Sequence, residues 1–254
     1  MEKRFDIIDS KNSIKCLMYC NNPHNFNTVV ISCHGFAGSK ENNTTKKLAE
    51  TILDKYKNLS ILTFDWPAHG EDVKQKLRLS DCNDYLNSVI KYVKEELKVD
   101  NILLQATSFG GYLVLKYINE NTNPFKKIAF RCPAINMYDI LINKTITEEE
   151  LNKINKGKIV LVGYRRKIKI DKEIIEELKE NDITKLDFID ESEKMLIVQG
   201  TEDELVDYNI VEQFAEDNII EFKSVEGADH RFNSPAEIRK YIDYVEELYK
   251  DEIK

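Results

Sequence analysis

The sequence lacks a long apolar run and an excess of positive charge. No window of its 254 residues approaches the roughly 20 apolar residues that a membrane-spanning helix requires. Lys and Arg number 37 against 45 Asp and Glu, so the net charge of −8 gives no electrostatic support to a nucleic-acid partner. The first residues, MEKRFDIIDSKNSIK, have early charge but no apolar stretch behind it. We therefore expect a cytoplasmic protein without a signal peptide, a membrane span or a nucleic-acid partner.

Cysteine is present, but not in a pattern that would bind a metal. The five cysteines are Cys16, Cys20, Cys33, Cys82 and Cys132, and no two of them form a C-x-x-C pair. Their odd number, together with the missing signal peptide, indicates reduced thiols. Cys16 and Cys20 lie closest together, but no His or Cys follows them at the spacing of a zinc finger. We expect no structural metal.

Strand-like and helix-like segments alternate along most of the chain, after a β-hairpin predicted over residues 4–8 and 13–19. Short apolar or β-branched runs predict strands at 28–32, 60–64, 101–105, 127–131, 194–199 and 219–225. Apolar residues at helical spacing predict helices at 44–57, 80–97, 109–119 and 209–216, and a last helix that Ser234 caps and Pro235 begins. This alternation predicts an α/β fold in which a mostly parallel central sheet is flanked by helices.

Residues 134–193 interrupt the alternation. A capping box at 147–150 opens a short helix that Gly157 ends, a strand-like run follows at 158–162, and Asp171 caps a helix at 172–180. The segment is too structured for a linker and too short for an independent domain. We interpret it as a small cap, inserted over the carboxyl ends of the strands, where ligand sites of α/β proteins lie. The core then consists of residues 1–133 and 194–254.

One serine stands directly behind a predicted strand. Ser108 lies in ATSFG (106–110), which is followed by Gly111. The pattern resembles a nucleophile elbow, G-x-S-x-G, in which a tight strand-to-helix turn exposes the serine hydroxyl. Ala106 replaces the first glycine of that pattern. Taken alone, the same residues also fit an ordinary turn.

A base and an acid follow at the ends of later strands. His230 lies in the loop EGADHRF (226–232), between the last predicted strand and the last helix, where catalytic groups are often placed. Asp203 lies in QGTED (199–203), where a buried carboxylate would orient the histidine. Asp207 is the reserve candidate for the acid. We expect Asp229 to stabilise the loop.

Oxyanion donors are predicted in the loop HGFAGSK (34–40), which follows the strand at 28–32. Small residues at a strand end let main-chain amides approach a ligand. The best candidates are the amides of Phe36 and Phe109, because Phe109 follows the nucleophile and begins a helix. His34 is expected to hydrogen-bond the loop. The order Ser, Asp, His along the chain is the order of α/β-hydrolases.

These motifs together resemble the α/β-hydrolase superfamily over nearly the full length. HGFAGSK is similar to the H-G-F-x-G-x-K loop of bacterial feruloyl/cinnamoyl esterase-like carboxylesterases, and FDWPAHG (64–70) resembles the D-x-x-G-H-G loop of the superfamily, with Ala68 where Gly is usual. GTED and GADHRF match the acid and histidine motifs. The resemblance implies Ser108, Asp203 and His230 as catalytic residues and Phe36 and Phe109 as oxyanion donors. It implies that His69 has a structural role in its loop and that Trp66 packs in the core or lines a pocket.

The leading hypothesis is a serine hydrolase that cleaves a small-molecule carboxylic ester through an acyl-enzyme, without a metal or an organic cofactor. A thioesterase, lysophospholipase, acyl-peptide hydrolase, C–C hydrolase or perhydrolase would use the same residues. An α/β-hydrolase fold that only binds a small ligand is the alternative from another class. We expect the basic run 165–169 to be a solvated face of the cap and Tyr138 and Tyr164 to pack there or to line a pocket. The oligomeric state stays open.

Overall fold

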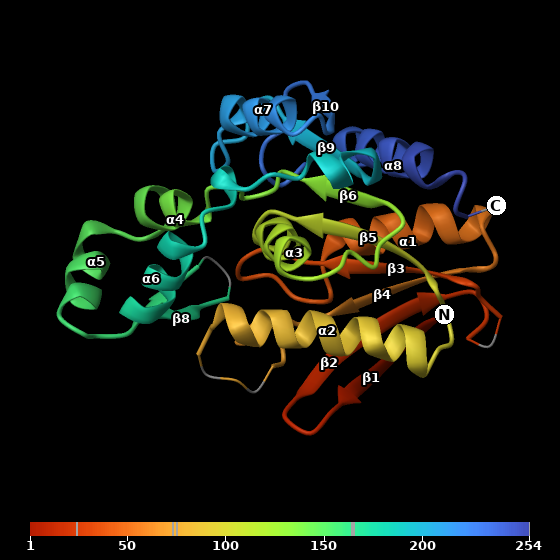
Figure 1. Cartoon of the computed structure of the whole chain (residues 1–254), viewed down its shortest axis with the longest axis horizontal. Coiled ribbons are helices and arrows are strands. Elements are labelled where there is room, and N and C mark those ends of the chain that lie inside the picture. The colour runs from red at the N-terminus through yellow and green to blue at the C-terminus, as the bar shows by residue number, and fades with distance from the viewer. Residues whose placement is uncertain (24, 73, 75, 164–165, 254) are drawn as a thin grey trace.

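A computed structural model describes residues 1–23, 25–72, 74, 76–163 and 166–253. In this part of the chain an eight-stranded sheet forms the centre of the molecule, with helices packed on it (Figure 1). In spatial order its strands are β1 (Glu2–Ile8), β2 (Ser13–Cys20), β4 (Leu59–Phe64), β3 (Thr28–Cys33), β5 (Asn101–Thr107), β6 (Ile128–Arg131), β9 (Met195–Gly200) and β10 (Glu221–Val225). The hairpin β1–β2 is antiparallel and joins β4 in antiparallel fashion, and the remaining neighbours are parallel. This architecture confirms the predicted α/β fold.

Helices cover both faces of the sheet. Helices α1 (Asn43–Lys55) and α8 (Pro235–Tyr249) contribute to one apolar core, whereas α2 (Leu79–Glu95), α3 (Phe109–Glu120) and α7 (Tyr208–Asp217) contribute to the other. Strands β3, β4, β5, β6 and β9 are covered on both sides, which explains why apart from Asn101 their residues are all buried. A strand buried on both faces reads as a continuous apolar run, and this is why the sequence predicts these strands well.

The helix caps follow the predicted chemistry. The Ser234 side chain accepts a hydrogen bond from the Ala236 amide, and Glu237 completes the capping box at the start of α8. Thr147 and Glu150 form the same arrangement at α5 (Glu148–Asn155), and Asp171 caps α6 (Lys172–Glu180). These caps satisfy main-chain amides that have no partner inside the helix.

The segment 134–193 forms a group of short elements at one end of the sheet (Figure 1). Besides α5 and α6 it contains α4 (Met137–Ile140), a π-helical turn (Leu141–Thr145), the strands β7 (Val160–Val162) and β8 (Ile168–Ile170), and the 3₁₀ turn Ile183–Lys185; a second 3₁₀ turn, Ile189–Lys194, leads from the segment into β9. The group meets the core near the end of β3, because a Cβ atom added to Gly163 would lie 3.1 Å from Cβ of Ala37. Arg78, just before α2, pairs with Asp171 at 2.7 Å.

The five cysteines are free thiols and all are buried. No helix within the described ranges is long and apolar enough to cross a membrane.

Candidate active site

Ser108 occupies a strained turn between β5 and α3. Its main-chain angles are φ 52° and ψ −118°, in the left-handed region that a serine rarely adopts. Its amide donates to the Arg131 carbonyl at 3.0 Å, and its carbonyl accepts from the Tyr112 and Ala134 amides at 3.2 and 3.1 Å. These three bonds hold the strained residue, because a costly conformation persists only where its surroundings fix it.

Small residues let other segments approach this turn. A Cβ atom on Gly110 would lie 2.6 Å from the His34 carbonyl oxygen, so any side chain there would force α3 away from the end of β3. A Cβ atom on Gly35 would lie 3.2 Å from Cβ of Ser108. Ala106, which replaces the first glycine of the elbow pattern, is fully buried. The sheet therefore accommodates its methyl group.

Ser108, His230 and Asp203 form one hydrogen-bonded chain. Nε2 of His230 lies 3.0 Å from Oγ of Ser108, and Nδ1 lies 2.9 Å from Oδ2 of Asp203. A carboxylate only accepts, so Nδ1 carries the proton and donates it to Asp203. The Nε2 lone pair is then free to accept from the Ser108 hydroxyl. The structure thus brings together the three side chains that the sequence singles out, from the ends of three different segments.

Asp203 is held as an ionised carboxylate. Its side chain is fully buried, and it accepts from the Leu205 and Val206 amides at 2.9 and 2.8 Å and from Nε2 of Gln199 at 2.9 Å. Burial alone raises the pKa of Asp203, but the hydrogen bonds to this carboxylate and its electrostatic interaction with the His230 ring outweigh burial and hold this pKa below its usual value. The group is therefore an acceptor for His230 at neutral pH.

The other acids near Asp203 have structural roles. Asp207, the reserve candidate, caps α7 by accepting from the Asn209 amide at 2.9 Å, and it is exposed. Asp229 stabilises its own loop as expected, since it accepts from the Arg231 amide at 2.9 Å. Gly200 brings the histidine loop close to β9, because a Cβ atom there would lie 2.3 Å from the Ala228 carbonyl oxygen.

The two predicted oxyanion donors border the serine. Phe109 is the first residue of α3, and its ring lies 5.9 Å from that of Phe36 in an edge-to-face contact. Gly35, next to Phe36, is the residue whose added Cβ atom would stand 3.8 Å from Oγ of Ser108. Among the hydrogen bonds of the described residues, neither the Phe36 nor the Phe109 amide has a protein acceptor. Phe109 thus follows the serine directly, and the loop that carries Phe36 lies beside it.

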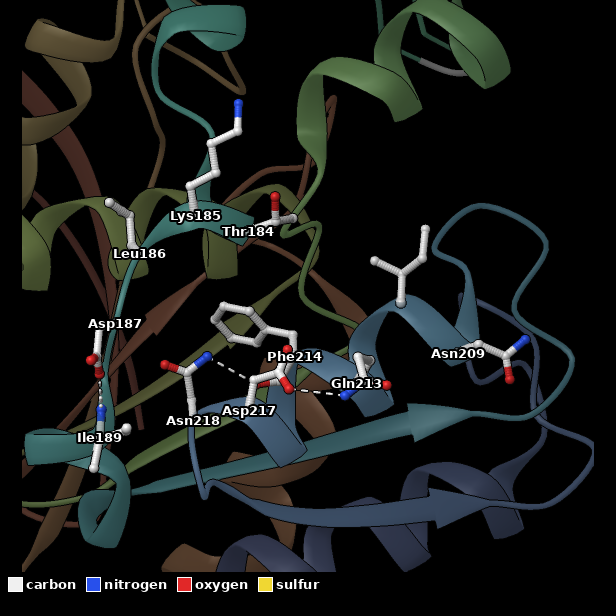
Figure 2. Close-up of a pocket in the computed structure, with 11 residues that line it drawn as sticks. Thr184, Lys185, Leu186, Asp187, Ile189, Asn209, Gln213, Phe214, Asp217 and Asn218 are labelled. Atoms are coloured by element: carbon white, nitrogen blue, oxygen red, sulfur yellow. Dashed lines mark hydrogen bonds between the residues drawn. The ribbon is translucent and has the colours of Figure 1, made fainter.

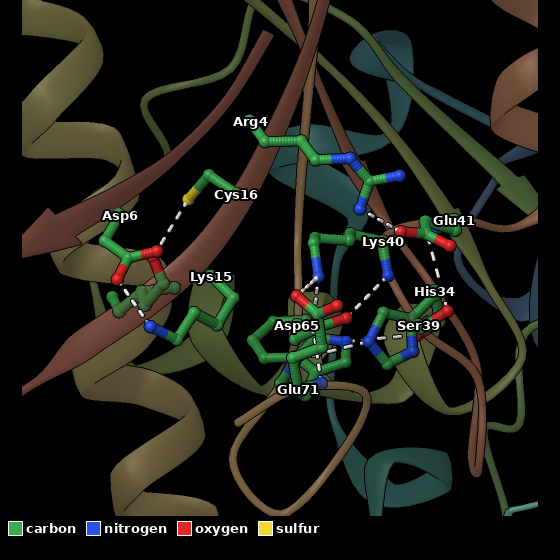
Figure 3. Close-up of polar contacts among 12 residues, drawn as sticks. Arg4, Asp6, Lys15, Cys16, His34, Ser39, Lys40, Glu41, Asp65 and Glu71 are labelled. Atoms are coloured by element: carbon green, nitrogen blue, oxygen red, sulfur yellow. Dashed lines mark hydrogen bonds and ion pairs between the residues drawn. The ribbon is translucent and has the colours of Figure 1, made fainter. Parts of the chain in front are cut away.

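A buried ion pair anchors the loop that carries Phe36 (Figure 3). The Lys40 ammonium lies 2.8 Å from Oδ2 of Asp65, and the Lys40 amide donates to Oδ1 at 2.7 Å. The ammonium also contacts Glu71 at 2.7 Å, and the Glu71 amide donates to Asp65 at 2.9 Å. Sequence analysis assigned no role to Lys40 or Asp65. Their ion pair joins the loops 34–40 and 65–71, which are distant from each other in the sequence.

Two neutral histidines fill the space behind this loop. Nδ1 of His34 donates to the Gly35 carbonyl at 2.8 Å, and Nε2 accepts from the Trp66 amide at 3.2 Å, so His34 holds the loop as expected. His69 donates to the Pro67 carbonyl at 2.8 Å, and its ring stacks on Phe109. Burial lowers the pKa of His34 to about 4 and that of His69 to about 3. Trp66 is fully buried and packs on Phe64, with ring centroids 4.6 Å apart.

One group of residues has the donor types of a metal site. Cys132, Asp203 and His230 present ligand atoms within 4.8 Å of one another. Burial raises the pKa of the Cys132 thiol, which disfavours the thiolate that a metal would require. The Asp203 oxygens already accept the hydrogen bonds described above. Within this group, Asp203 and His230 are thus already engaged with each other.

The pocket in Figure 2 lies away from the hydrogen-bonded side chains of Ser108, His230 and Asp203. It has a volume of about 550 Å³ and is formed by the segment 184–189 and by α7, with Phe214 and Asn218 in its wall. None of the residues that line it belongs to the Ser108 site. Tyr138 lines a smaller pocket of about 250 Å³ between α4 and the end of α6, to which α3 contributes Tyr112. Arg166 and Lys167 are exposed, as expected of a solvated face, whereas Tyr164 and Arg165 lie outside the described residues.

Comparison with known proteins places this geometry in a family. A family model described as the alpha/beta hydrolase fold matches residues 28–158. No curated protein matches the sequence.

Several solved structures share the fold over the whole chain. Est1E from Butyrivibrio proteoclasticus, solved with ferulic acid bound, superposes with a TM-score of 0.77 at 19% identity, covering 98% of this chain and 99% of that one. A putative hydrolase from Agrobacterium vitis S4 gives a TM-score of 0.72 at 15% identity, covering 100% and 99%. The esterase Pf2001 from Pyrococcus furiosus gives 0.70 at 16% identity, covering 99% and 92%.

We expect Gly70→Ala to destabilise the protein more than Gly157→Ala. Both glycines have positive φ, 55° and 77°, so a Cβ atom adds backbone strain of about 1–2 kcal/mol at either position. Only at Gly70 would it also collide, 2.1 Å from Cγ of Asp65, whereas Gly157 faces open space. Overpacking adds about 1–3 kcal/mol. Urea unfolding of both variants measures the difference, and equal losses would show that the Asp65 contact does not constrain the loop.

We also expect the protein to lose stability as the pH falls from about 6.5 toward 5. Folding keeps His34 and His69 neutral down to a pKa of about 4 and 3, whereas in the unfolded chain they bind protons near pH 6.5. Below pH 6.5 the unfolded state then binds more protons than the folded state. The contribution of these histidines to the free energy of unfolding is therefore largest above pH 6.5 and decreases below it, by up to about 1.4 kcal/mol per pH unit for each imidazole. Urea unfolding across this range measures the slope. His69→Phe should reduce it, and an unchanged slope would contradict this origin.

Proposed function

The chain belongs to the α/β-hydrolase family, and from this premise we propose that it is a serine hydrolase that cleaves a carboxylic ester of a small molecule. The observation that carries the proposal is the continuous chain of hydrogen bonds from Ser108 through His230 to Asp203. A protein that only binds ligands has no need of a base aligned on a strained serine. This alignment is our reason to prefer an enzyme over a binding protein of the same fold.

In the proposed first step Ser108 attacks the ester carbonyl. Nε2 of His230 takes the hydroxyl proton while Oγ forms a bond to the carbonyl carbon, and the carbonyl oxygen becomes an oxyanion. The Phe36 and Phe109 amides stabilise this oxyanion, and the start of α3 adds a favourable dipole. The tetrahedral intermediate collapses when the C–O bond to the alcohol breaks. His230 returns its proton to the departing alcohol, leaving Ser108 acylated.

In the second step water removes the acyl group. His230 takes a proton from water, the hydroxide oxygen bonds to the acyl carbon, and the proton returns to Oγ of Ser108 as the acid leaves. Asp203 stays ionised and stabilises the imidazolium in both steps. Neither step uses a metal or an organic cofactor. The buried free thiols favour a cytoplasmic location for this chemistry.

We further propose that residues 134–193 act as a cap over the serine. Support comes from the position of Gly163 beside Ala37, which follows the proposed donor Phe36 in the oxyanion loop. A cap at this place would limit the size of the group that reaches Ser108. The ester preference is supported by the structural neighbour described as an esterase, Pf2001, and by Est1E, which was solved with the carboxylic acid ferulic acid bound. A thioester or an acyl-peptide would be attacked by the same groups.

We expect a fluorophosphonate to label wild-type protein once, at Ser108. The activated hydroxyl displaces fluoride from phosphorus, so intact mass should increase by one adduct. Ser108→Ala should take up none, whereas Ser224→Ala, which removes a hydroxyl on β10 bonded to Tyr208, should be labelled at the wild-type rate. If folded wild-type protein takes up no adduct, even from small probes, the binding-only alternative gains support and the enzyme proposal fails.

The leaving group is tested with one acyl chain presented in three ways. We expect the oxygen ester to be hydrolysed with a higher kcat/KM than the matched thioester and the matched amide. A thioester that is hydrolysed fastest would keep the serine hydrolase but overturn the ester assignment. Each rate is read from product release and compared with Ser108→Ala as the blank.

A further inference from the structure

Arg131 stands where the three segments of the proposed active site meet. It is the last residue of β6, which lies between the strand that leads to Ser108 and the strand that leads to Asp203. The register places it opposite Thr107 of β5 on one side and opposite Val198 of β9 on the other. Its main chain is thus fixed between the two strands that lead to Ser108 and to Asp203.

The Arg131 side chain reaches the third segment. Nη1 donates to the main-chain carbonyl of His230 at 3.0 Å, and the guanidinium carbon lies 5.1 Å from the centre of the Phe232 ring. The residue is only 6% exposed. Its main-chain carbonyl meanwhile accepts from the Ser108 amide at 3.0 Å. A single residue therefore binds the nucleophile turn with its backbone and the histidine loop with its side chain.

A buried arginine at this place needs an explanation beyond packing. Removing a cation from water costs several kcal/mol unless partners compensate, and within the described residues no carboxylate pairs with Arg131 and its Nε has no partner. Ala129, which shares the face of β6 on which Arg131 lies, is apolar and fully buried, so an apolar residue fits this face. The guanidinium contacts the His230 carbonyl and the Phe232 ring, and both lie in the loop of His230. That points to a role in the geometry of the loop.

The main chain of His230 itself has few other anchors. The His230 amide reaches Glu204 only at 3.4 Å, and the turn closes through a 3.3 Å bond from the Phe232 amide to the Asp229 carbonyl. Phe232 also has a positive φ of 54°. The bond from Arg131 is the shorter contact to the His230 main chain. Loss of it would leave a buried carbonyl without a donor and free the loop to shift.

We propose that Arg131 is a positioning residue that sets the separation between Ser108 and His230. It acts through the His230 carbonyl and touches no reacting atom. The inference rests on the proposed function, since it assigns a role within that same site. A shift of about 1 Å in such a pair lowers the rate of the chemical step by up to about 100-fold.

The experiment compares three variants. Arg131→Met keeps length and apolar packing but removes the donors, Arg131→Lys keeps the charge and a donor nitrogen without the planar guanidinium, and Arg131→Ala leaves space for added guanidinium ion. The matched control is Tyr249→Phe, which removes another buried side-chain donor from a main-chain carbonyl of the same sheet, that of Leu104. Thermal unfolding of each variant separates loss of stability from loss of activity.

We expect kcat of Arg131→Met to fall about 10- to 100-fold with KM within about twofold of wild type, and the rate of fluorophosphonate labelling to fall equally. Arg131→Lys should lose about three- to tenfold, and millimolar guanidinium should restore part of the activity of Arg131→Ala. Tyr249→Phe should lose stability but keep its kcat. A folded Arg131→Met with kcat within twofold of wild type overturns the inference. If that variant does not fold, a wild-type kcat for Arg131→Lys overturns it.

A structural readout separates this inference from the proposed function. If wild-type protein does not react with the fluorophosphonate, the proposed function fails. Crystal structures of the wild type and of Arg131→Met then still test whether Arg131 positions His230. A distance between Nε2 of His230 and Oγ of Ser108 clearly longer than the 3.0 Å of the intact protein supports it. An unchanged distance overturns it.

Discussion

The left-handed turn at Ser108 is the constraint on which the rest of the site depends. A serine at φ 52° carries strain of about 1–3 kcal/mol, and three main-chain bonds from two other segments offset it. The turn also places the serine hydroxyl and the Phe109 amide at the start of α3, at the edge of the sheet where the parallel strands end. Because the strands that precede them are parallel, Asp203 and the loops that carry Phe36 and His230 reach the same edge.

Rigidity behind the loop 34–40, which carries the proposed oxyanion donor Phe36, comes from polar groups that are paired or neutral. The Lys40–Asp65 ion pair is buried at both ends, and its hydrogen bonds to main-chain amides fasten the loop at 34–40 to the loop at 65–71. His34 and His69 stay uncharged because burial lowers their pKa values. Donors held in this way do not need to reorganise when charge develops on a substrate oxygen, which is the main requirement of electrostatic stabilisation.

Sequence patterns predict those parts of the fold that depend on local chemistry. Buried strands read as apolar runs, and Ser234, Thr147 and Asp171 cap the helices that they were expected to cap. The choice between Asp203 and Asp207 is different, because both follow Gly200 within a few residues. Only the packing decides it, since Asp207 faces outward and caps α7, while Asp203 lies against His230.

The features that sequence analysis missed depend on contacts between distant segments. Arg131 meets His230 across 99 residues of chain, and Lys40 meets Asp65 across 25. Neither arrangement has a local pattern, and a charged residue at a strand end or in a loop is usually solvated. The short helix α4 and the π-helical turn after it also went unpredicted, because four or five residues are too few to show a period.

The central claim is that Ser108 becomes acylated during turnover. The most direct measurement is a rapid-mixing experiment with an activated phenyl ester, followed by quenching and peptide mass analysis. The account predicts a burst of phenol close to one equivalent per active protein, with the acyl group found on the peptide that contains Ser108. Hydrolysis without a burst would leave acylation unsupported unless the same peptide carried the acyl group. Turnover with the acyl group on another residue, or undiminished turnover by Ser108→Ala, would contradict the account.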